Sequence, residues 1–181
     1  MTAIKIDNIQ SQLGSHKINY KYLNKMYPDW NLNKVALKTG IKKLFIANEK
    51  EDVLNLSLRS CHKTLRGFNK NLIDCIIVVT QTAKNKLPSV SCILQDKLKL
   101  KKNLIAFDIG LGCSGYIYAL GTIKSLLSTN MASNVLLVCS DTYSKFTNEN
   151  NRTCRTVFSD AASSCIIRKA KGKNNIVFSF L

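Results

Sequence analysis

Proline, glycine and long apolar runs are scarce in this sequence of 181 residues, which contains two prolines and eight glycines. Long flexible linkers and collagen-like repeats are therefore not expected. No apolar run approaches the roughly 18 residues that a membrane-spanning helix needs, and the first ten residues, MTAIKIDNIQ, contain no apolar signal core. Hydrophobic residues make up 45% of the chain and charged residues 21%, as is ordinary for a globular protein. The composition predicts a globular protein of the cytoplasm.

Acidic residues are also few: 27 lysines and arginines face 11 aspartates and glutamates, so the formal net charge is +16. Such a charge favours an acidic partner, for example a phosphorylated ligand or an acidic protein. However, 22 of the basic residues are lysines spread along the chain, which a compositional drift of the source genome also produces. The basic tracts at 97–102 and 169–173 lack the interleaved aromatic residues that stack on single-stranded nucleic acid. Nucleic acid and membrane are therefore not the expected partners.

Histidine is rare, and the cysteines show neither disulfide nor metal-ligand spacing. The seven cysteines are odd in number and form no C-x-x-C pair, and several lie inside apolar runs, as Cys75 and Cys139 do. We expect most of them to be small buried residues in a reducing compartment. The two histidines, His16 in a loop and His62 on a helix, are expected at the surface or in packing. No metal site is predicted.

Apolar segments typical of strands alternate with segments typical of helices along most of the chain. The expected strands cover residues 3–13, 74–80, 104–109, 135–139, 165–167 and 176–181, and the expected helices cover residues 20–26, 33–38, 51–68, 90–98 and 116–127. Residues 41–50 and 141–155 are expected to be loops. This alternation predicts an α/β fold with a mostly parallel mixed sheet covered by helices on both faces.

The helix expected at 51–68 has the clearest periodicity. Its apolar residues recur at steps of four and three: Leu54, Leu58, Cys61, Leu65 and Phe68. These residues are expected to form the buried face of the helix. The helix at 90–98 follows Pro88, and Ser89 is expected to cap it.

The glycine-rich turn at 110–115 has two interpretations. Its sequence fits G-x-G-x-x-G between a strand and a helix, and Asp141 follows the next strand, as in dinucleotide-binding domains. Such a fingerprint normally lies in the first strand-helix unit of its domain, whereas a strand, a helix, a further strand and a further helix already precede this unit.

The second interpretation starts from Cys113 in the same turn. Backbone amides and the helix dipole stabilise a thiolate there, which can attack a thioester, although a structural cysteine fits the turn as well.

Several segments follow one another in an order that is typical of one family. The most specific are the Cys113-Ser-Gly turn and the segment Thr156–Ala162, which reads Thr-Val-Phe-Ser-Asp-Ala-Ala. With these segments the chain resembles the β-ketoacyl-acyl-carrier-protein synthase III family of the thiolase-like superfamily. The other matching segments are 38–47, 74–82, 87–89, 106–116, 135–144 and 151–155. The resemblance covers most of the chain and implies a thiolase-like fold.

The resemblance also implies a function. Cys113 matches the family's nucleophile, which accepts an acyl group from acyl-CoA before decarboxylative condensation with malonyl-acyl-carrier protein in fatty-acid or related biosynthesis. Arg152 matches the arginine that packs on the CoA adenine. Leu87 matches the position that lines the acyl pocket of the second subunit in a homodimer. Acyl-CoA is thus the expected substrate, an acidic acyl-carrier protein the expected partner, and no further cofactor is implied.

Three features depart from the family pattern. Ser159 stands where the family has a glycine, and Trp30 lies a few residues before the position of the family's CoA-binding tryptophan. The family's catalytic His and Asn belong to a second half that has no match here. Residues 1–181 are therefore expected to be the N-terminal domain of a thiolase-like condensing enzyme whose C-terminal half is absent from this chain. The alternatives are a noncatalytic thiolase-like partner subunit and a dinucleotide-binding domain.

Overall fold

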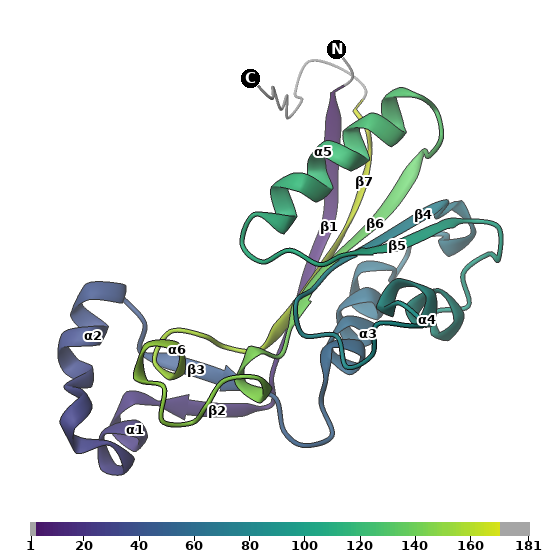
Figure 1. The fold of residues 1–181 in the computed structure, drawn as a ribbon. Coiled ribbons are helices and arrows are strands. Elements are labelled where there is room, and N and C mark those ends of the chain that lie inside the picture. Colours follow the sequence, from purple (N-terminus) through teal and green to yellow (C-terminus); the bar gives the residue numbers. More distant parts are fainter. Residues whose placement is uncertain (1–2, 171–181) are drawn as a thin grey trace.

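A central sheet of five strands organises the computed structural model, which describes residues 3–170 (Figure 1). The strands are β1 (Ile4–Leu13), β4 (Cys75–Val79), β5 (Ile105–Ile109), β6 (Asn134–Asp141) and β7 (Ala161–Lys169), and their order is β1-β7-β6-β4-β5. β7 is antiparallel to both of its neighbours, and β4 is parallel to β5 and to β6. Four of the five strands therefore run in one direction. The prediction of a mostly parallel mixed sheet is confirmed.

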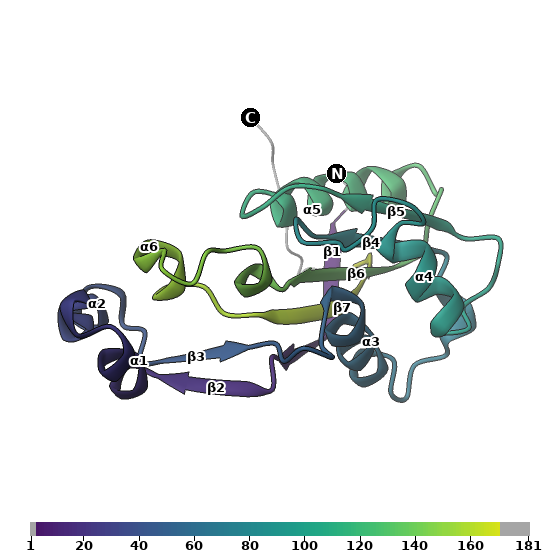
Figure 2. The same ribbon diagram turned by 60° about the horizontal axis from the view of Figure 1, so that its bottom comes forward.

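Helices cover both faces of this sheet (Figure 2). α5 (Gly115–Ser128) packs on one face, and α3 (Val53–Thr64) and α4 (Val90–Lys97) pack on the other. Every residue of β4 is buried: Ile77 belongs to the core beneath α5, and Ile76 belongs to the core beneath α3 and α4. An uninterrupted apolar strand is expected where both faces of a parallel sheet are covered. The predicted layers are confirmed.

A smaller unit lies to one side of the sheet, at the left of Figure 1. It contains the strands β2 (His16–Asn19) and β3 (Lys43–Ile46), the helices α1 (Tyr20–Met26), α2 (Leu32–Thr39) and α6 (Arg152–Arg155), and the 3-10 turns η1 (Pro28–Trp30) and η3 (Tyr143–Lys145). We call residues 16–46 and 143–158 the outlying lobe, and the rest the body. The lobe has its own small core of Ile18, Tyr20, Leu23, Leu32 and Leu44. Tyr20 Oη donates a hydrogen bond of 2.6 Å to the carbonyl of Thr156, which ties the two segments of the lobe together.

The carboxylate of Asp160 joins the lobe to the body. It is fully buried and accepts hydrogen bonds from the backbone N–H of Ala47 (2.7 Å) and of Ser144 (3.0 Å), and from Ser144 Oγ. The backbone N–H of Asp160 donates to the carbonyl of Phe45, and its carbonyl accepts from Gly14. One residue at the start of β7 therefore holds β3, η3 and the link between β1 and β2.

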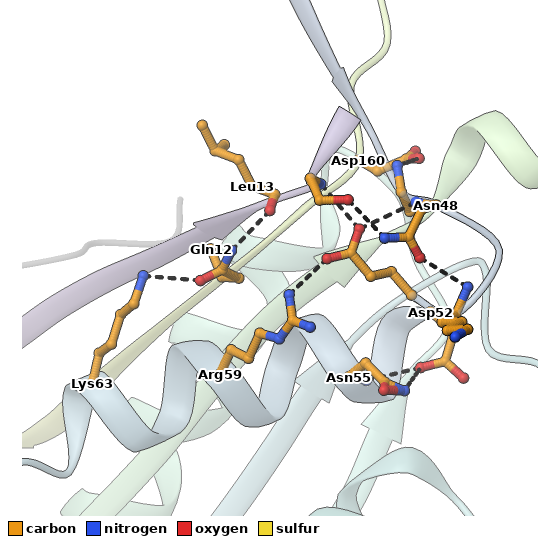
Figure 3. A network of polar contacts seen from close by, with 12 residues as sticks. Gln12, Leu13, Asn48, Asp52, Asn55, Arg59, Lys63 and Asp160 are labelled. Carbon is orange, nitrogen blue, oxygen red and sulfur yellow. Dashed lines mark hydrogen bonds and ion pairs between the residues drawn. The ribbon is translucent and has the colours of Figure 1, made fainter. Parts of the chain in front are cut away.

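Glu51 is a second buried carboxylate at this junction, and Figure 3 labels two of its partners, Asn48 and Arg59. It accepts hydrogen bonds from the backbone N–H of Ser15 (2.9 Å) and Asn48 (3.1 Å), and Arg59 Nη1 of α3 lies 2.6 Å from its Oε1. Burial raises the pKa of Glu51, but these hydrogen bonds outweigh the burial and leave the pKa below its ordinary value. The side chain is therefore ionised at neutral pH.

Several short elements differ from the sequence-based expectations. The loop expected at 41–50 contains β3, and His16 begins β2 instead of lying in a loop. The loop expected at 141–155 contains η3 and α6, and β7 begins four residues before the expected strand at 165–167. The strands β2, β3 and β7 form by pairing with segments distant in the sequence, so local periodicity does not reveal them. The helices η3 and α6 have only three and four residues, which is too short for a helical periodicity to show.

The helix expected at 51–68 forms over residues 53–64, and its most buried face differs from the expected one. On the expected apolar face, the side chains of Leu54, Leu58 and Leu65 are only partly buried. Ser60 and Thr64 are fully buried. Both of these hydroxyls are within 2.8 Å of Ser164 Oγ in β7. Hydrogen bonding to the sheet lets small polar side chains occupy this interface. The predicted capping of α4 is confirmed, since Ser89 Oγ accepts from the backbone N–H of Cys92.

No helix among residues 3–170 is long and apolar enough to cross a membrane. Within the same residues no group of His, Cys, Asp and Glu could hold a metal ion. The expected strand at 176–181 lies outside the described residues.

Candidate active site

Cys113 lies in the turn that joins β5 to α5, as predicted. β5 ends at Ile109 and α5 begins at Gly115, and the turn closes with a hydrogen bond of 2.8 Å from the N–H of Gly115 to the carbonyl of Gly112. The Cys113 side chain is exposed. α5 is 14 residues long, and its N-terminus, where free N–H groups and the helix dipole are positive, begins two residues after Cys113.

Two of the glycines in the turn lie close to side chains at or just beyond the end of β4, and the buried Val79 leaves no room for a side chain at Gly115. A Cβ atom added to Gly115 would lie 2.5 Å from Cγ1 of Val79, at the carboxyl end of β4. A Cβ atom added to Gly112 would lie 2.6 Å from Oε1 of Gln81, just beyond that strand. At Gly110, by contrast, an added Cβ would meet nothing within 4 Å. The glycines thus let the backbone of the turn approach the end of β4 closely.

Most other cysteines lack the surroundings of Cys113. Burial raises the pKa of the Cys61, Cys75 and Cys165 thiols to about 12 and that of the Cys139 thiol to about 11. These thiols stay protonated at neutral pH and are weak nucleophiles. Cys113, by contrast, is solvent-accessible and lies two residues before the first residue of α5.

The three predicted site residues lie at the same edge of the sheet. Leu87 is in the loop after β4, Cys113 is in the turn after β5, and Arg152 begins α6 in the segment after β6. The carboxyl ends of parallel strands meet at one edge, which is where ligands bind in open α/β sheets. Leu87 is 85% exposed and Arg152 is also exposed, so both are accessible to a ligand or a second subunit.

The lobe that contains Arg152 also carries a pair of stacked aromatic residues. The rings of Trp30 and Tyr27 stack with their centroids 3.9 Å apart and an angle of 9° between their planes. Sequence reasoning noted Trp30 and overlooked Tyr27. One face of the indole is therefore already covered by a ring of this chain.

Ser159, the departure from the family's glycine, makes a contact of its own. Its Oγ accepts a hydrogen bond of 3.1 Å from the backbone N–H of Phe45 in β3. A glycine has no atom for this bond. The substitution therefore adds a link between the lobe and the start of β7.

The carboxylate of Asp141 is engaged within the protein. Its Oδ1 accepts hydrogen bonds from the backbone N–H of Gln81 (2.8 Å), the backbone N–H of Thr82 (3.1 Å) and Thr82 Oγ1 (2.8 Å). The dinucleotide interpretation needs this carboxylate to bind a ribose hydroxyl. The packing of Gly115 against Val79 explains this glycine without a bound phosphate. The dinucleotide interpretation is not favoured.

Gln81 is the residue near the turn that sequence reasoning missed. Its proximity to Gly112 depends on the parallel register of β4 and β5, which pairs Val79 with Ile109. The sequence does signal that Gly112 needs space, but it does not indicate which side chain fills that space.

Comparisons with known proteins point to one family. Residues 107–181 match the model of the family described as 3-Oxoacyl-[acyl-carrier-protein (ACP)] synthase III. The chain is 35% identical over 135 residues to the beta-ketoacyl-[acyl-carrier-protein] synthase III of Neisseria meningitidis serogroup A, covering 74% of this chain and 42% of that protein. It is 31% identical over 175 residues to the beta-ketoacyl-[acyl-carrier-protein] synthase III 2 of Bacillus anthracis, covering 96% and 53%.

Solved structures show the same similarity. A crystal structure of a 3-oxoacyl-(acyl-carrier-protein) synthase III superposes with a TM-score of 0.90 at 32% identity, over 96% of this chain and 52% of that one. The corresponding structure from Aquifex aeolicus gives a TM-score of 0.86 at 28% identity, over 94% and 55%. The chain spans about half the length of the curated relatives it matches, and the match is to their N-terminal half.

Proposed function

Because the chain belongs to the β-ketoacyl-acyl-carrier-protein synthase III family, we propose that it forms the part of such a synthase that holds the acyl-accepting nucleophile, Cys113. The observation that carries this proposal is the exposed thiol of Cys113 directly before a 14-residue helix. The relatives are named beta-ketoacyl-[acyl-carrier-protein] synthase III, and an exposed thiol suits the first step of such a synthesis, the transfer of an acyl group to the protein.

In that step the Cys113 thiolate attacks the carbonyl carbon of the acyl-CoA thioester. A new sulfur-carbon bond forms, the bond to the CoA sulfur breaks, and CoA leaves as its thiolate. In the second step malonyl-acyl-carrier protein loses carbon dioxide, and the resulting carbanion attacks the acyl-enzyme. The β-ketoacyl-acyl-carrier protein is released and Cys113 becomes a thiolate again. Covalent catalysis thus divides one difficult condensation into two easier reactions.

Arg152 and Leu87 have supporting roles in this proposal. Arg152 stacks on or pairs with the nucleotide of acyl-CoA, since it is exposed at the start of α6 in the same lobe that carries Trp30. Leu87, on an exposed loop, lines the acyl pocket of the second subunit in a homodimer. The net charge of +16 favours approach of both acyl-CoA and an acidic carrier protein.

The condensation step needs a catalytic His and Asn in addition to Cys113. His16 lies in β2 of the lobe, and His62 is exposed on α3, across the sheet from α5. Neither is placed as a base for the turn at Cys113. We therefore assign the catalytic His and Asn to a C-terminal half, supplied by the same or another chain. Without these groups we expect acyl transfer to Cys113 to occur and condensation to be lost or strongly reduced.

The acyl-accepting role is tested by incubating the intact protein with radiolabelled acyl-CoA, digesting it and identifying the labelled peptide. We expect label on the peptide that contains Cys113 and none in Cys113→Ser. Cys92 is an exposed cysteine on α4, so Cys92→Ser is a matched control that should keep the label. Absence of label from the Cys113 peptide, with or without a supplied second half, would contradict the proposal.

A further inference from the structure

The side chain of Gln81 forms a wall of the turn that holds Cys113. Its Oε1, Cδ and Nε2 atoms lie 2.6, 3.0 and 3.2 Å from the position where a Cβ of Gly112 would stand. The whole carboxamide therefore packs against the residue directly before Cys113. Gln81 itself is exposed, so its end group is not held in place by burial.

The backbone around Gln81 is held by Asp141 at the end of β6. Oδ1 of Asp141 accepts from the N–H groups of Gln81 and Thr82 and from the hydroxyl groups of Thr80 and Thr82, at distances of 2.8 to 3.2 Å. Thr82 Oγ1 in turn accepts from the backbone N–H of Thr142 at 2.9 Å. The segment after β4 is thus fixed to the segment after β6 immediately beside the nucleophile turn.

We propose that Gln81 is a positioning residue for Cys113 and that Asp141 holds Gln81 in place. This inference rests on the proposed acyl-accepting role of Cys113. Gly112 has more backbone freedom than any other residue type, so the turn needs an outside contact to keep one conformation. Misplacement of a reacting group by about 1 Å can cost roughly 100-fold in rate. The carboxamide is also uncharged, so it leaves the charge balance of a neighbouring thiolate unchanged.

Variants of Gln81 test the positioning role, because an exposed side chain can be changed without threatening the fold. In Gln81→Ala we expect kcat for acyl transfer to Cys113 to fall about 10-fold while KM for acyl-CoA changes less than about twofold, since the nucleotide site is untouched. Gln81→Met has nearly the same length and should restore kcat to within about twofold, because the contact with Gly112 is one of packing. An unchanged kcat in Gln81→Ala would overturn the proposal.

A charged variant tests the proximity of Gln81 to the thiol independently of acyl transfer. The rate of Cys113 alkylation by iodoacetamide is measured against pH in wild type and in Gln81→Glu. A carboxylate beside the sulfur disfavours the thiolate, so the midpoint of the profile should move to higher pH, and the Met variant should leave it in place. An unmoved midpoint would overturn the proposed placement. If wild-type Cys113 fails to accept acyl groups but this midpoint moves, the proposed function fails and the proximity of Gln81 stands.

The role of Asp141 is separated from general stability by a matched aspartate at the other end of the sheet. Asp74 precedes β4, and its carboxylate accepts from the backbone N–H groups of Ser133 and Asn134. Asp141→Ala and Asp74→Ala should both lower the melting temperature, but only Asp141→Ala should lower kcat. Asp141→Asn keeps the Oδ1 acceptor and should therefore retain most of the wild-type kcat. This variant tests the role of Asp141 even if Asp141→Ala does not fold. Equal kcat losses in both Ala variants, or no recovery in Asp141→Asn, would contradict the role of Asp141.

Discussion

The body and the outlying lobe are held together by different forces. The body is closed by apolar packing on both faces of its sheet, where residues such as Ile77 and Leu120 are almost completely buried. The lobe has a core of only five buried residues, and it is fixed to the body by the buried Asp160, which bonds to Phe45 and Ser144. Glu51 holds Ser15 and Asn48, which lie just outside the two strands of the lobe. Apolar packing is distributed over many contacts, whereas each carboxylate serves several hydrogen bonds at once. The lobe should therefore be the more easily detached of the two regions.

Charge distinguishes the two regions as well. The lobe carries ten basic and two acidic residues, which is half of the formal net charge of +16. All seven lysines between residues 17 and 43 are exposed. The positive charge is thus concentrated beside Arg152, where the proposal places a ligand that carries phosphate groups. This distribution favours a functional surface over an even compositional drift.

The largest expected effect comes from shortening one core residue in each region. Leu120→Ala in α5 and Leu23→Ala in α1 each remove a buried side chain, at a cost of about 2–5 kcal/mol. We expect Leu120→Ala to lower the free energy of global unfolding, and Leu23→Ala to speed amide hydrogen exchange in the lobe while the strands of the body stay protected. Loss of protection in β4 on Leu23→Ala would show that the two regions unfold as one unit.

The next effect is expected at the junction. Asp160→Ala leaves two backbone N–H groups and one hydroxyl without their acceptor, which should cost about 3 kcal/mol, since a buried unpaired donor costs roughly 1–3 kcal/mol and water will reach some of them. Asp7 is a suitable control because it pairs with Lys5 and Arg168 at the surface, where ion pairs contribute about 1 kcal/mol or less. Faster exchange of the Ala47 amide, measured by NMR, should distinguish the first variant from Asp7→Ala. Equal effects of the two substitutions would contradict the structural role of Asp160.

The difference between the body and the lobe also explains which elements the sequence could predict and which it could not. The strands β4, β5 and β6 and helix α5 were predicted because their apolar patterns are local. β2 and β3 were missed because each has four residues, and their pairing of Lys17 with Phe45 is set by contacts across about 28 positions of the chain. The position of Cys113 follows from its glycine turn, whereas the contact between Gln81 and Gly112 depends on the register of two strands. Local pattern thus predicts the body and the nucleophile, and tertiary contacts determine the lobe and the support of the site.

The stability of the junction between lobe and body should depend on pH through the ionisation of Glu51. The folded protein holds the pKa of Glu51 below its ordinary value of 4.5, so its contribution to stability is complete above that pH and is lost as the pH falls through the folded pKa. We expect the protection of the Ser15 and Asn48 amides, measured as the exchange rate relative to the intrinsic rate at the same pH, to fall in acid by about 1.5 kcal/mol, which is typical of a hydrogen bond to a charged group. In Glu51→Gln this acid dependence should disappear. A dependence that survives in Glu51→Gln would assign it to another carboxylate.

The smallest expected effect is that of Ser159, which adds one hydrogen bond to the same junction. Ser159→Ala removes the acceptor for the Phe45 N–H and should cost about 1 kcal/mol, the usual net value of one hydrogen bond. Ser159→Thr keeps a hydroxyl at this position and should retain most of that stability. Hydrogen exchange of the Phe45 amide is the measurement, because global unfolding is dominated by the body and responds little to the lobe. If Ser159→Ala exchanges no faster than wild type at Phe45, the serine adds nothing to the junction, and the contacts of Asp160 hold β3 in place without it.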